Sequence, residues 1–405
     1  RWISEKRFLH ALNYCMVLPG PEAQQLATYI GWLMHGTWGG IAAGALFVLP
    51  SLAILITLSW IYLAFGTLPL IAGIFYGIKP AVTAIVLAAA WRIGGKALTN
   101  MWLWAIAAAA FVAIFMGGVP FPAIVLCAAL IGAIGGRIAP AKFLPGGGHG
   151  STNNGANTAI IGDDGPIAPH AVFRLPRMLL HLSVGLGLWF AAMALLAAHS
   201  GLQGTLAQMG WFFTKAALFT FGGAYAVLPY VYQGAVENFQ WLNAQQMIDG
   251  LALGETTPGP LIMVVAFVGF VGGWTKAVLG PEAPFLGAAL AASIVTFFTF
   301  LPSFLFILIG GPLVEATHGQ QKFTAPLTAI TAAVVGVIIS LALFFAWKIW
   351  WPLATVDAPF RGTFEWFSMV VTLAAAVALM RYKANVIAVI VVCGALGVAK
   401  TLWGG

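Results

Sequence analysis

Two short motifs place prolines, glycines and a carboxylate within long apolar segments. Residues 255–260 read Glu-Thr-Thr-Pro-Gly-Pro, and residues 18–22 read Leu-Pro-Gly-Pro-Glu. Proline cannot donate a backbone hydrogen bond and disfavours helical geometry in the residue before it, so we expect a helix to stop at each motif and a second half-helix to start after it. The free N–H groups and positive dipole end of the second half-helix would bind an anion. The alternative is that the prolines merely kink two packed helices.

Glu255 and Glu22 are the acidic residues of these motifs. Glu22 directly follows its break and could simply cap the half-helix that it begins. Glu255 lies at the C-terminal end of the preceding half-helix, where the helix dipole disfavours a negative charge unless the carboxylate is protonated or paired. Since a nearby anion would repel either carboxylate, we predict that Glu255, with Glu22 as the second candidate, couples proton binding to anion binding.

A third motif, residues 219–230, sets a glycine pair among aromatic residues. Gly222 and Gly223 permit a close approach to the backbone, so a substrate could touch the main chain there, with Tyr225 beside it. Crossing of two helices through small residues explains the pair equally well. Lys215, two turns before Gly222, is either a snorkelling residue at the membrane interface or a positive charge that faces the pathway.

The anion would be held mainly by backbone N–H groups and hydroxyls, because a site with few fixed positive charges avoids trapping its substrate. No cysteine or histidine cluster has metal-ligand spacing, and the sequence contains neither a phosphate-binding loop nor a dinucleotide fingerprint, so we expect no cofactor and no ATP-driven step. An enzyme is excluded because no nucleophile or metal motif accompanies the two glutamates. The predicted substrate-binding residues are Pro19, Gly20, Pro21, Glu22, Gln24, Gly222, Gly223, Tyr225, Thr256, Thr257, Pro258, Gly259 and Pro260.

The composition requires that these motifs lie in a membrane protein. Of the 405 residues, 61% are hydrophobic and 7% are charged, whereas soluble domains contain roughly 25% charged residues. The apolar runs are long and continuous, unlike the alternating segments of about ten residues in membrane β-barrels, so we predict an all-α polytopic protein with roughly a dozen membrane segments. Basic residues in cytoplasmic loops, not binding to nucleic acid, explain the formal charge of +7.

A polar, glycine-rich stretch divides the chain. Residues 140–172 cannot bury enough apolar surface to fold alone. We therefore predict a linker there, between a first membrane repeat at residues 1–139 and a second at residues 173–405. Basic residues flank the linker and place it on the cytoplasmic side by the positive-inside rule. These residues are Arg137, Lys142, Arg174 and Arg177.

The two halves are similar in sequence. A shift of 239 residues aligns Trp2 and the first Pro-Gly-Pro with Trp241 and the second, and a shift of 252 residues aligns Leu49-Pro50-Ser51 with Leu301-Pro302-Ser303. The difference of 13 residues falls near residues 272–284 and indicates an enlarged loop. We predict that the repeats are inverted about a pseudo-two-fold axis in the membrane plane, so that both half-helix N-termini converge on one site.

At these motifs the sequence resembles the chromate ion transporter family. The resemblance covers both halves and implies a secondary transporter that expels chromate from the bacterial cytoplasm in a long two-domain form, with sulfate as the look-alike tetrahedral anion. It also implies a first-half glycine motif ahead of Trp2, so we expect the native start to lie upstream of Arg1. The matching residues are Trp2, Leu18-Pro19-Gly20-Pro21, residues 22–31, residues 47–51, residues 221–225 and residues 255–260.

We therefore expect the protein to export an oxyanion by alternating access across the bacterial inner (cytoplasmic) membrane and to confer chromate resistance. The expected partners are chromate or sulfate as the transported anion, a proton as the coupling ion and the lipid bilayer, with no nucleic acid and with a homodimer as one possible assembly. The alternatives are a channel or carrier for another small anion such as sulfate, and a non-transporting membrane scaffold.

Overall fold

The computed structural model describes residues 3–143, 170–221, 224–316, 324–355 and 358–403. Every regular element in these ranges is a helix, which confirms the predicted fold class. Seven helices in the described ranges are long and apolar enough to cross a bilayer, so the chain is a multi-pass membrane protein. They are α2 (Glu22–Phe65), α3 (Pro69–Ala97), α5 (Phe121–Ile138), α6 (Leu175–Ser200), α11 (Pro284–Ala316), α12 (Thr324–Trp350) and α14 (Val386–Trp403).

The remaining helices are shorter, so the estimate of a dozen membrane segments exceeds the seven long apolar helices in the described part of the chain. The apolar windows at residues 103–116 and 367–380 form helices of 15 residues each, below the roughly 20 residues that a straight span needs. These shorter helices are α1 (Glu5–Val17), α4 (Met101–Phe115), α7 (Thr205–Phe219), α8 (Ala224–Tyr232), α9 (Ala244–Thr256), α10 (Val264–Thr275) and α13 (Trp366–Met380), with short helical turns at Pro140–Lys142, Gln233–Asn238 and Leu261–Met263.

Helix α2 is a hairpin of two helices. Its 44 residues would extend roughly 66 Å if straight, about twice the thickness of a bilayer core. The backbone leaves helical geometry at His35 and at Gly36, which has a φ of 68°. Residues on either side of this turn then pack together, since Gly40 lies against Trp32. The second helix of this hairpin corresponds in sequence to α11.

The two Pro-Gly-Pro motifs form the tips of two further hairpins. Tip 1 comprises residues 18–21, between α1 and α2, and tip 2 comprises residues 257–260, between α9 and α10. Helices α9 and α10 lie side by side, because Gly254 packs on Val264 and Gly250 packs on Phe267. The sequence suggested two half-helices of one span, whereas the chain turns back at each tip.

Glycine makes both turns feasible. Gly20 has a φ of 126° and Gly259 has a φ of 142°, in the region that L side chains rarely adopt. Equivalent glycines of the two motifs therefore adopt the same unusual backbone conformation. The two motifs are therefore similar in local backbone structure as well as in sequence.

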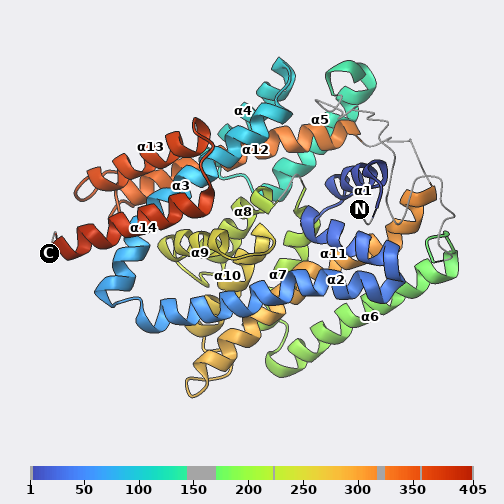
Figure 1. The fold of residues 1–405 in the computed structure, drawn as a ribbon, viewed down its shortest axis with the longest axis horizontal. Helices are drawn as coiled ribbons and strands as arrows, with labels where there is room; N and C mark the ends of the chain where they lie inside the picture. The colour runs from blue at the N-terminus through green and yellow to red at the C-terminus, as the bar shows by residue number, and fades with distance from the viewer. Residues whose placement is uncertain (1–2, 144–169, 222–223, 317–323, 356–357, 404–405) are drawn as a thin grey trace.

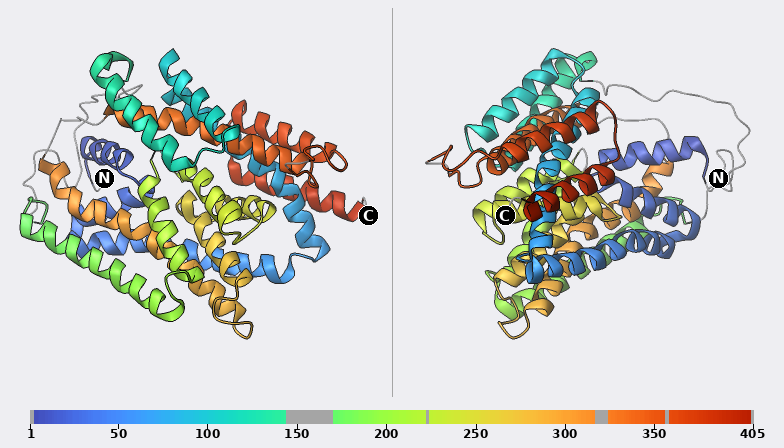
Figure 2. Two further views of the ribbon diagram at one scale, coloured as in Figure 1. Left: turned by 180° about the vertical axis from the view of Figure 1, so that it is seen from behind. Right: turned by 60° about the vertical axis from the view of Figure 1, so that its left-hand side comes forward.

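The helices of the two halves pack against each other crosswise. Helix α3 packs on α13 and α14, whereas α12 packs on α4 and α5, and α2 packs on α11. Helices α9 and α10, drawn in yellow, lie at the centre of the molecule in both Figure 1 and Figure 2. Every residue of α10 from Val264 to Gly273 is buried. Tip 2 is thus attached to a helix that is buried over most of its length.

Candidate functional site

Glu255, next to tip 2, is paired with a tyrosine from another helix. The hydroxyl of Tyr225 in α8 donates a hydrogen bond of 2.5 Å to Oε1 of Glu255 in α9. Arg92 in α3 acts electrostatically on both side chains. The partner that Glu255 needs at the C-terminal end of its helix is therefore Tyr225, with a guanidinium nearby.

The two threonines of tip 2 cap the end of α9. Thr256 Oγ1 donates a hydrogen bond of 2.8 Å to the carbonyl of Leu253. Thr257 Oγ1 donates to the same carbonyl at 2.7 Å and to that of Gly254 at 3.1 Å. In this arrangement both hydroxyls are engaged with their own helix. Beyond them, Pro258 and Gly259 are exposed and Pro260 is buried.

Tip 1 is held by hydrogen bonds from both sides. The N–H of Gly20 donates to the carbonyl of Thr220 at 2.8 Å, at the end of α7. Nε2 of Gln25 donates to the carbonyl of Pro19 at 2.8 Å. These bonds fix the exit from the turn toward Pro21, which is buried. Gln25 thus donates a side-chain hydrogen bond to a backbone carbonyl of its own tip, as Thr256 and Thr257 do to carbonyls next to tip 2.

The first turn of α2 carries the other predicted polar residues of this site. Glu22 is its acidic first-turn residue and is partly exposed, in the position where a helix dipole stabilises a carboxylate. Gln24 is fully buried, and its Nε2 donates to Thr28 Oγ1 at 3.0 Å. Its Oε1 has no hydrogen-bond partner. No contact joins Glu22 to Glu255 in the described residues, so the two carboxylates are separate groups.

Each tip packs against a serine of the opposite half. A Cβ atom placed on Gly259 would lie 2.7 Å from Ser51 Oγ in α2. A Cβ atom on Gly20 would lie still closer to Ser303 Oγ in α11. The sequence repeat aligns Gly20 with Gly259 and Ser51 with Ser303. The two tips are therefore packed in the same way on equivalent partners.

The glycine-pair motif connects the two tips. Thr220, at its start, accepts the hydrogen bond from Gly20 of tip 1. Tyr225, five residues later, donates to Glu255 beside tip 2. Gly222 and Gly223 themselves lie outside the described residues. The described residues on either side of the glycine pair therefore contact tip 1 and Glu255 beside tip 2.

Sequence reasoning missed a buried ion pair. Asp249 in α9 is 2% exposed, and its Oδ2 lies 3.4 Å from Nζ of Lys79 in α3 and accepts a 2.9 Å hydrogen bond from Tyr62 in α2. Its Oδ1 has no partner. The sequence does contain a signal for this pair, because Lys79 and Asp249 each interrupt a long apolar run. The pair joins the hairpin of tip 2 to two helices of the first half.

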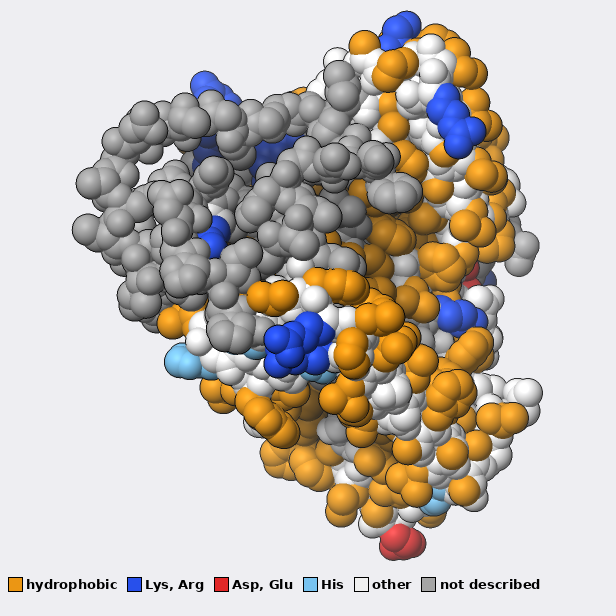
Figure 3. All heavy atoms as spheres, turned by 90° about the vertical axis from the view of Figure 1, so that its right-hand side faces the viewer, with side chains coloured by type: hydrophobic (Ala, Val, Ile, Leu, Met, Phe, Trp, Pro, Cys, Tyr) orange, Lys and Arg blue, Asp and Glu red, His pale blue; other side chains and the backbone are white. Residues whose placement is uncertain are grey.

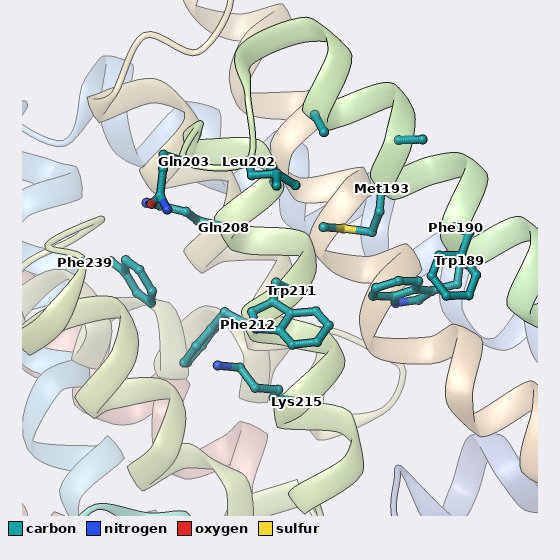
Figure 4. Close-up of a pocket in the computed structure, with 13 residues that line it drawn as sticks. Trp189, Phe190, Met193, Leu202, Gln203, Gln208, Trp211, Phe212, Lys215 and Phe239 are labelled. Carbon is teal, nitrogen blue, oxygen red and sulfur yellow. The ribbon is translucent and has the colours of Figure 1, made fainter.

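A cavity of about 590 Å³ lies apart from both tips, between α6 and α7. Figure 4 shows its largely apolar lining, which includes Trp189 and Met193 from α6 and Trp211 from α7. Lys215 lines it too, with Nζ 5.8 Å from the centre of the Trp211 ring. Lys215 thus lies near an aromatic side chain of its own helix, α7. The described residues include no group of three or more His, Cys, Asp or Glu side chains suited to a metal.

Comparison with known proteins places these features in a family. The sequence model of the chromate transporter family matches residues 1–133 and 207–398, in two segments on either side of the linker. The chain belongs to the chromate transporter family. This confirms the resemblance found at the Pro-Gly-Pro motifs, and the family is one of transporters, not of enzymes. No solved structure matches the chain.

Related proteins align with most of the chain. A chromate transport protein of Pseudomonas aeruginosa is 34% identical over 343 residues, which cover 84% of this chain and 71% of that protein. A probable chromate transport protein of Synechococcus elongatus is 31% identical over 342 residues, which cover 84% and 74%. An uncharacterized transporter of Methanocaldococcus jannaschii is 24% identical, covering 87% and 78%.

Proposed function

We propose that this chromate transporter family member exports chromate from the bacterial cytoplasm across the cytoplasmic membrane. It is a secondary transporter that works by alternating access. Its two inverted repeats, residues 1–139 and 173–405, are joined by a cytoplasmic linker at residues 140–172. The anion binds at the two tips. The family membership and the names of the bacterial relatives support chromate as the substrate.

The observation that carries this proposal is the crosswise packing of the two halves. Helix α3 of the first half packs on α13 and α14 of the second, and α12 of the second packs on α4 and α5 of the first. In Figure 1, α2 ends by running from right to left, whereas its counterpart α11 runs back toward the right. Opposite courses of equivalent helices are what inverted repeats require, and such repeats bind substrate at their interface.

The distribution of charge supports the proposed orientation. Figure 3 views the side of the molecule that is on the right in Figure 1, where Lys and Arg side chains gather over a largely apolar surface. The four basic residues that flank the linker are all exposed: Arg137, Lys142, Arg174 and Arg177. By the positive-inside rule the linker therefore faces the cytoplasm.

Glu255 is the proposed coupling residue. A dianion at tip 2 would repel an ionised Glu255 strongly in a medium of low dielectric constant, so the neutral carboxyl is favoured when the anion is bound. Tyr225 can donate to the ionised carboxylate or exchange roles with the neutral acid. Proton and anion binding are then linked, and a proton gradient can drive transport without ATP. Glu22, at the start of α2, is the second candidate.

Chromate flux into liposomes that contain the purified protein tests the function. We expect flux that saturates with chromate concentration and is competed by sulfate, as for a carrier of tetrahedral dianions. Flux without saturation indicates a channel. Absence of chromate flux from protein that is folded contradicts the proposed function, and sulfate flux alone reassigns the substrate to sulfate.

A further inference from the structure

Two serines at the tips are fully buried and lack hydrogen-bond partners. Ser51 in α2 is 1% exposed and Ser303 in α11 is 0% exposed. The Oγ atoms of both have no partner. A buried hydroxyl without a partner destabilises a protein, so its retention needs a reason.

Three threonines on the same helices are satisfied in the usual way. Thr57 in α2 donates to the carbonyl of Ala53 at 2.9 Å. In α11, Thr296 and Thr299 each donate to the carbonyl four residues earlier, at 2.8 Å and 2.7 Å. This is the ordinary arrangement for a helical hydroxyl in apolar surroundings. Ser51 and Ser303 depart from it, so their O–H groups are free to donate elsewhere.

The position of the two serines indicates where a group that accepts hydrogen bonds from their hydroxyls would lie. Ser51 Oγ lies against Gly259 of tip 2, and Ser303 Oγ lies against Gly20 of tip 1. Gln25 Nε2 is also close to Gly20, and only one of its two hydrogens is used in the bond to Pro19. Ser303 Oγ and Gln25 Nε2 at tip 1, and Ser51 Oγ at tip 2, thus occupy the space that a side chain on the tip glycine would fill, so each tip has at least one side-chain donor directly against its backbone.

The chemistry suits a tetrahedral oxyanion. Hydroxyl and amide donors neutralise oxyanion charge through hydrogen bonds that shorten and strengthen when the acceptor is ionised. Such donors, unlike a lysine or arginine at the same place, release a dianion readily. Thr256 and Thr257 already donate to carbonyls of α9, so they have no hydrogen left for the anion in this conformation.

We propose that Ser51 and Ser303 are oxyanion-binding residues, each completing the Pro-Gly-Pro tip of the opposite repeat with a hydroxyl donor. The assignment rests on the proposed function for its ligand, a tetrahedral dianion. It adds two residues from α2 and α11, so that both repeats contribute to each tip. Anion occupancy would therefore hold the two halves together at both tips.

The test is equilibrium binding of chromate, and separately of sulfate, to purified protein in detergent. We expect Ser51→Ala and Ser303→Ala each to raise the dissociation constant about tenfold, as loss of one hydrogen bond to a charged group does. Thermal stability should stay the same or rise, because each variant also removes an unpaired buried hydroxyl. Ser59→Ala is the matched control, since Ser59 in α2 is equally buried and unpaired but does not lie at a tip.

Each result separates the possible roles of the two serines. Unchanged affinity in both tip variants, or an equal loss in Ser59→Ala, contradicts the proposal. A fall in melting temperature without a change in affinity assigns the serines a packing role and also contradicts it. Binding in detergent does not depend on direction or coupling. Failure of the wild-type protein to transport bound chromate in liposomes would therefore contradict the proposed function alone.

Discussion

At the scale of single residues, Glu255 is the proposed coupling group. Glu255→Gln keeps the size of the side chain and a hydrogen-bond acceptor for Tyr225, but it cannot ionise. We expect this variant to bind chromate with a flatter dependence on pH and to lose accumulation of chromate against a gradient, because proton binding is no longer linked to anion binding. Chromate binding at several pH values and uptake driven by a proton gradient measure the two effects.

Glu282→Gln is the control for charge removal. Glu282 is exposed in the loop between α10 and α11, so its replacement should leave both measurements unchanged. Accumulation by Glu255→Gln equal to that of the wild-type protein would remove Glu255 from the mechanism.

The tip glycines should tolerate no side chain. In Gly259→Ala the new Cβ would lie 2.7 Å from Ser51 Oγ and 2.8 Å from Ser51 Cβ, so the helix carrying Ser51 must move. Overpacking of this kind costs about 1–3 kcal/mol, in addition to about 1 kcal/mol for the left-handed backbone. Gly280→Ala isolates the backbone part, because Gly280 has a φ of 87° and open space around it. Melting temperatures in detergent should fall further for Gly259→Ala, and an equal fall would show that tip 2 is not packed on α2.

The residue types of the site could be predicted from sequence more readily than their partners. Pro-Gly-Pro implies a break that only glycine can turn, and Gly20 and Gly259 do adopt positive φ. The hydroxyls of Thr256 and Thr257 were expected to face an anion, yet local carbonyls are nearer and accept their hydrogens. Ser51 was noticed only as a marker of the repeat, because nothing local reveals that it meets Gly259, which lies more than 200 residues away in sequence.

At the scale of elements, the Asp249–Lys79 pair fastens α9 to α3. Removing one partner of a buried ion pair leaves an uncompensated charge and costs about 3–5 kcal/mol. We therefore expect Lys79→Met to lower the melting temperature strongly and the double variant Lys79→Met/Asp249→Asn to recover most of that loss. Unfolding of the purified variants in detergent measures both.

The pair between Lys400 and Glu365 is the comparison for this prediction. Its side chains are 41% and 28% exposed, and exposed pairs contribute at most about 1 kcal/mol. Lys400→Met should therefore have a small effect. Similar losses for Lys79→Met and Lys400→Met would mean that Asp249 is hydrated and that the pair does not fasten the helices.

Helix positions could be predicted, but the course of the chain between helices could not. Long apolar runs located α2 and α11 correctly, since apolar length is a local property. The turn at His35 and Gly36 falls in the glycine-rich residues 35–40 between two apolar runs, but this composition does not reveal that the chain reverses its direction there. The hairpin of α9 and α10 depends on Gly250 admitting Phe267 and Gly254 admitting Val264, which is a matter of packing between residues on either side of the tip.

At the scale of the whole molecule, the proposed inverted repeats predict that equivalent loops of the two halves lie on opposite sides of the membrane. His35, in the turn of α2, and Glu282, between α10 and α11, occupy corresponding positions in the two halves, and both are exposed. In a variant with exposed Cys127 replaced by alanine, we expect His35→Cys to react with a membrane-impermeant thiol reagent from the cytoplasmic side only. Glu282→Cys should react from the opposite side only.

Labelling of both positions from the same side would contradict inversion and would favour repeats related by an axis along the membrane normal. The homodimer stays a prediction, as does the boundary of each repeat at the linker.

The most direct test of the account measures proton and chromate movement together, with purified protein in sealed liposomes. With a pH difference across the membrane and no initial chromate gradient, we predict that chromate accumulates on one side above its concentration on the other while protons move down their gradient. Accumulation on the alkaline side indicates that proton and anion move together, and accumulation on the acidic side indicates the exchange that export against an inward proton gradient requires. A protonophore should abolish the accumulation. Chromate that only equilibrates across the membrane, with no accompanying proton movement, would contradict the claim that this protein is a proton-coupled oxyanion transporter.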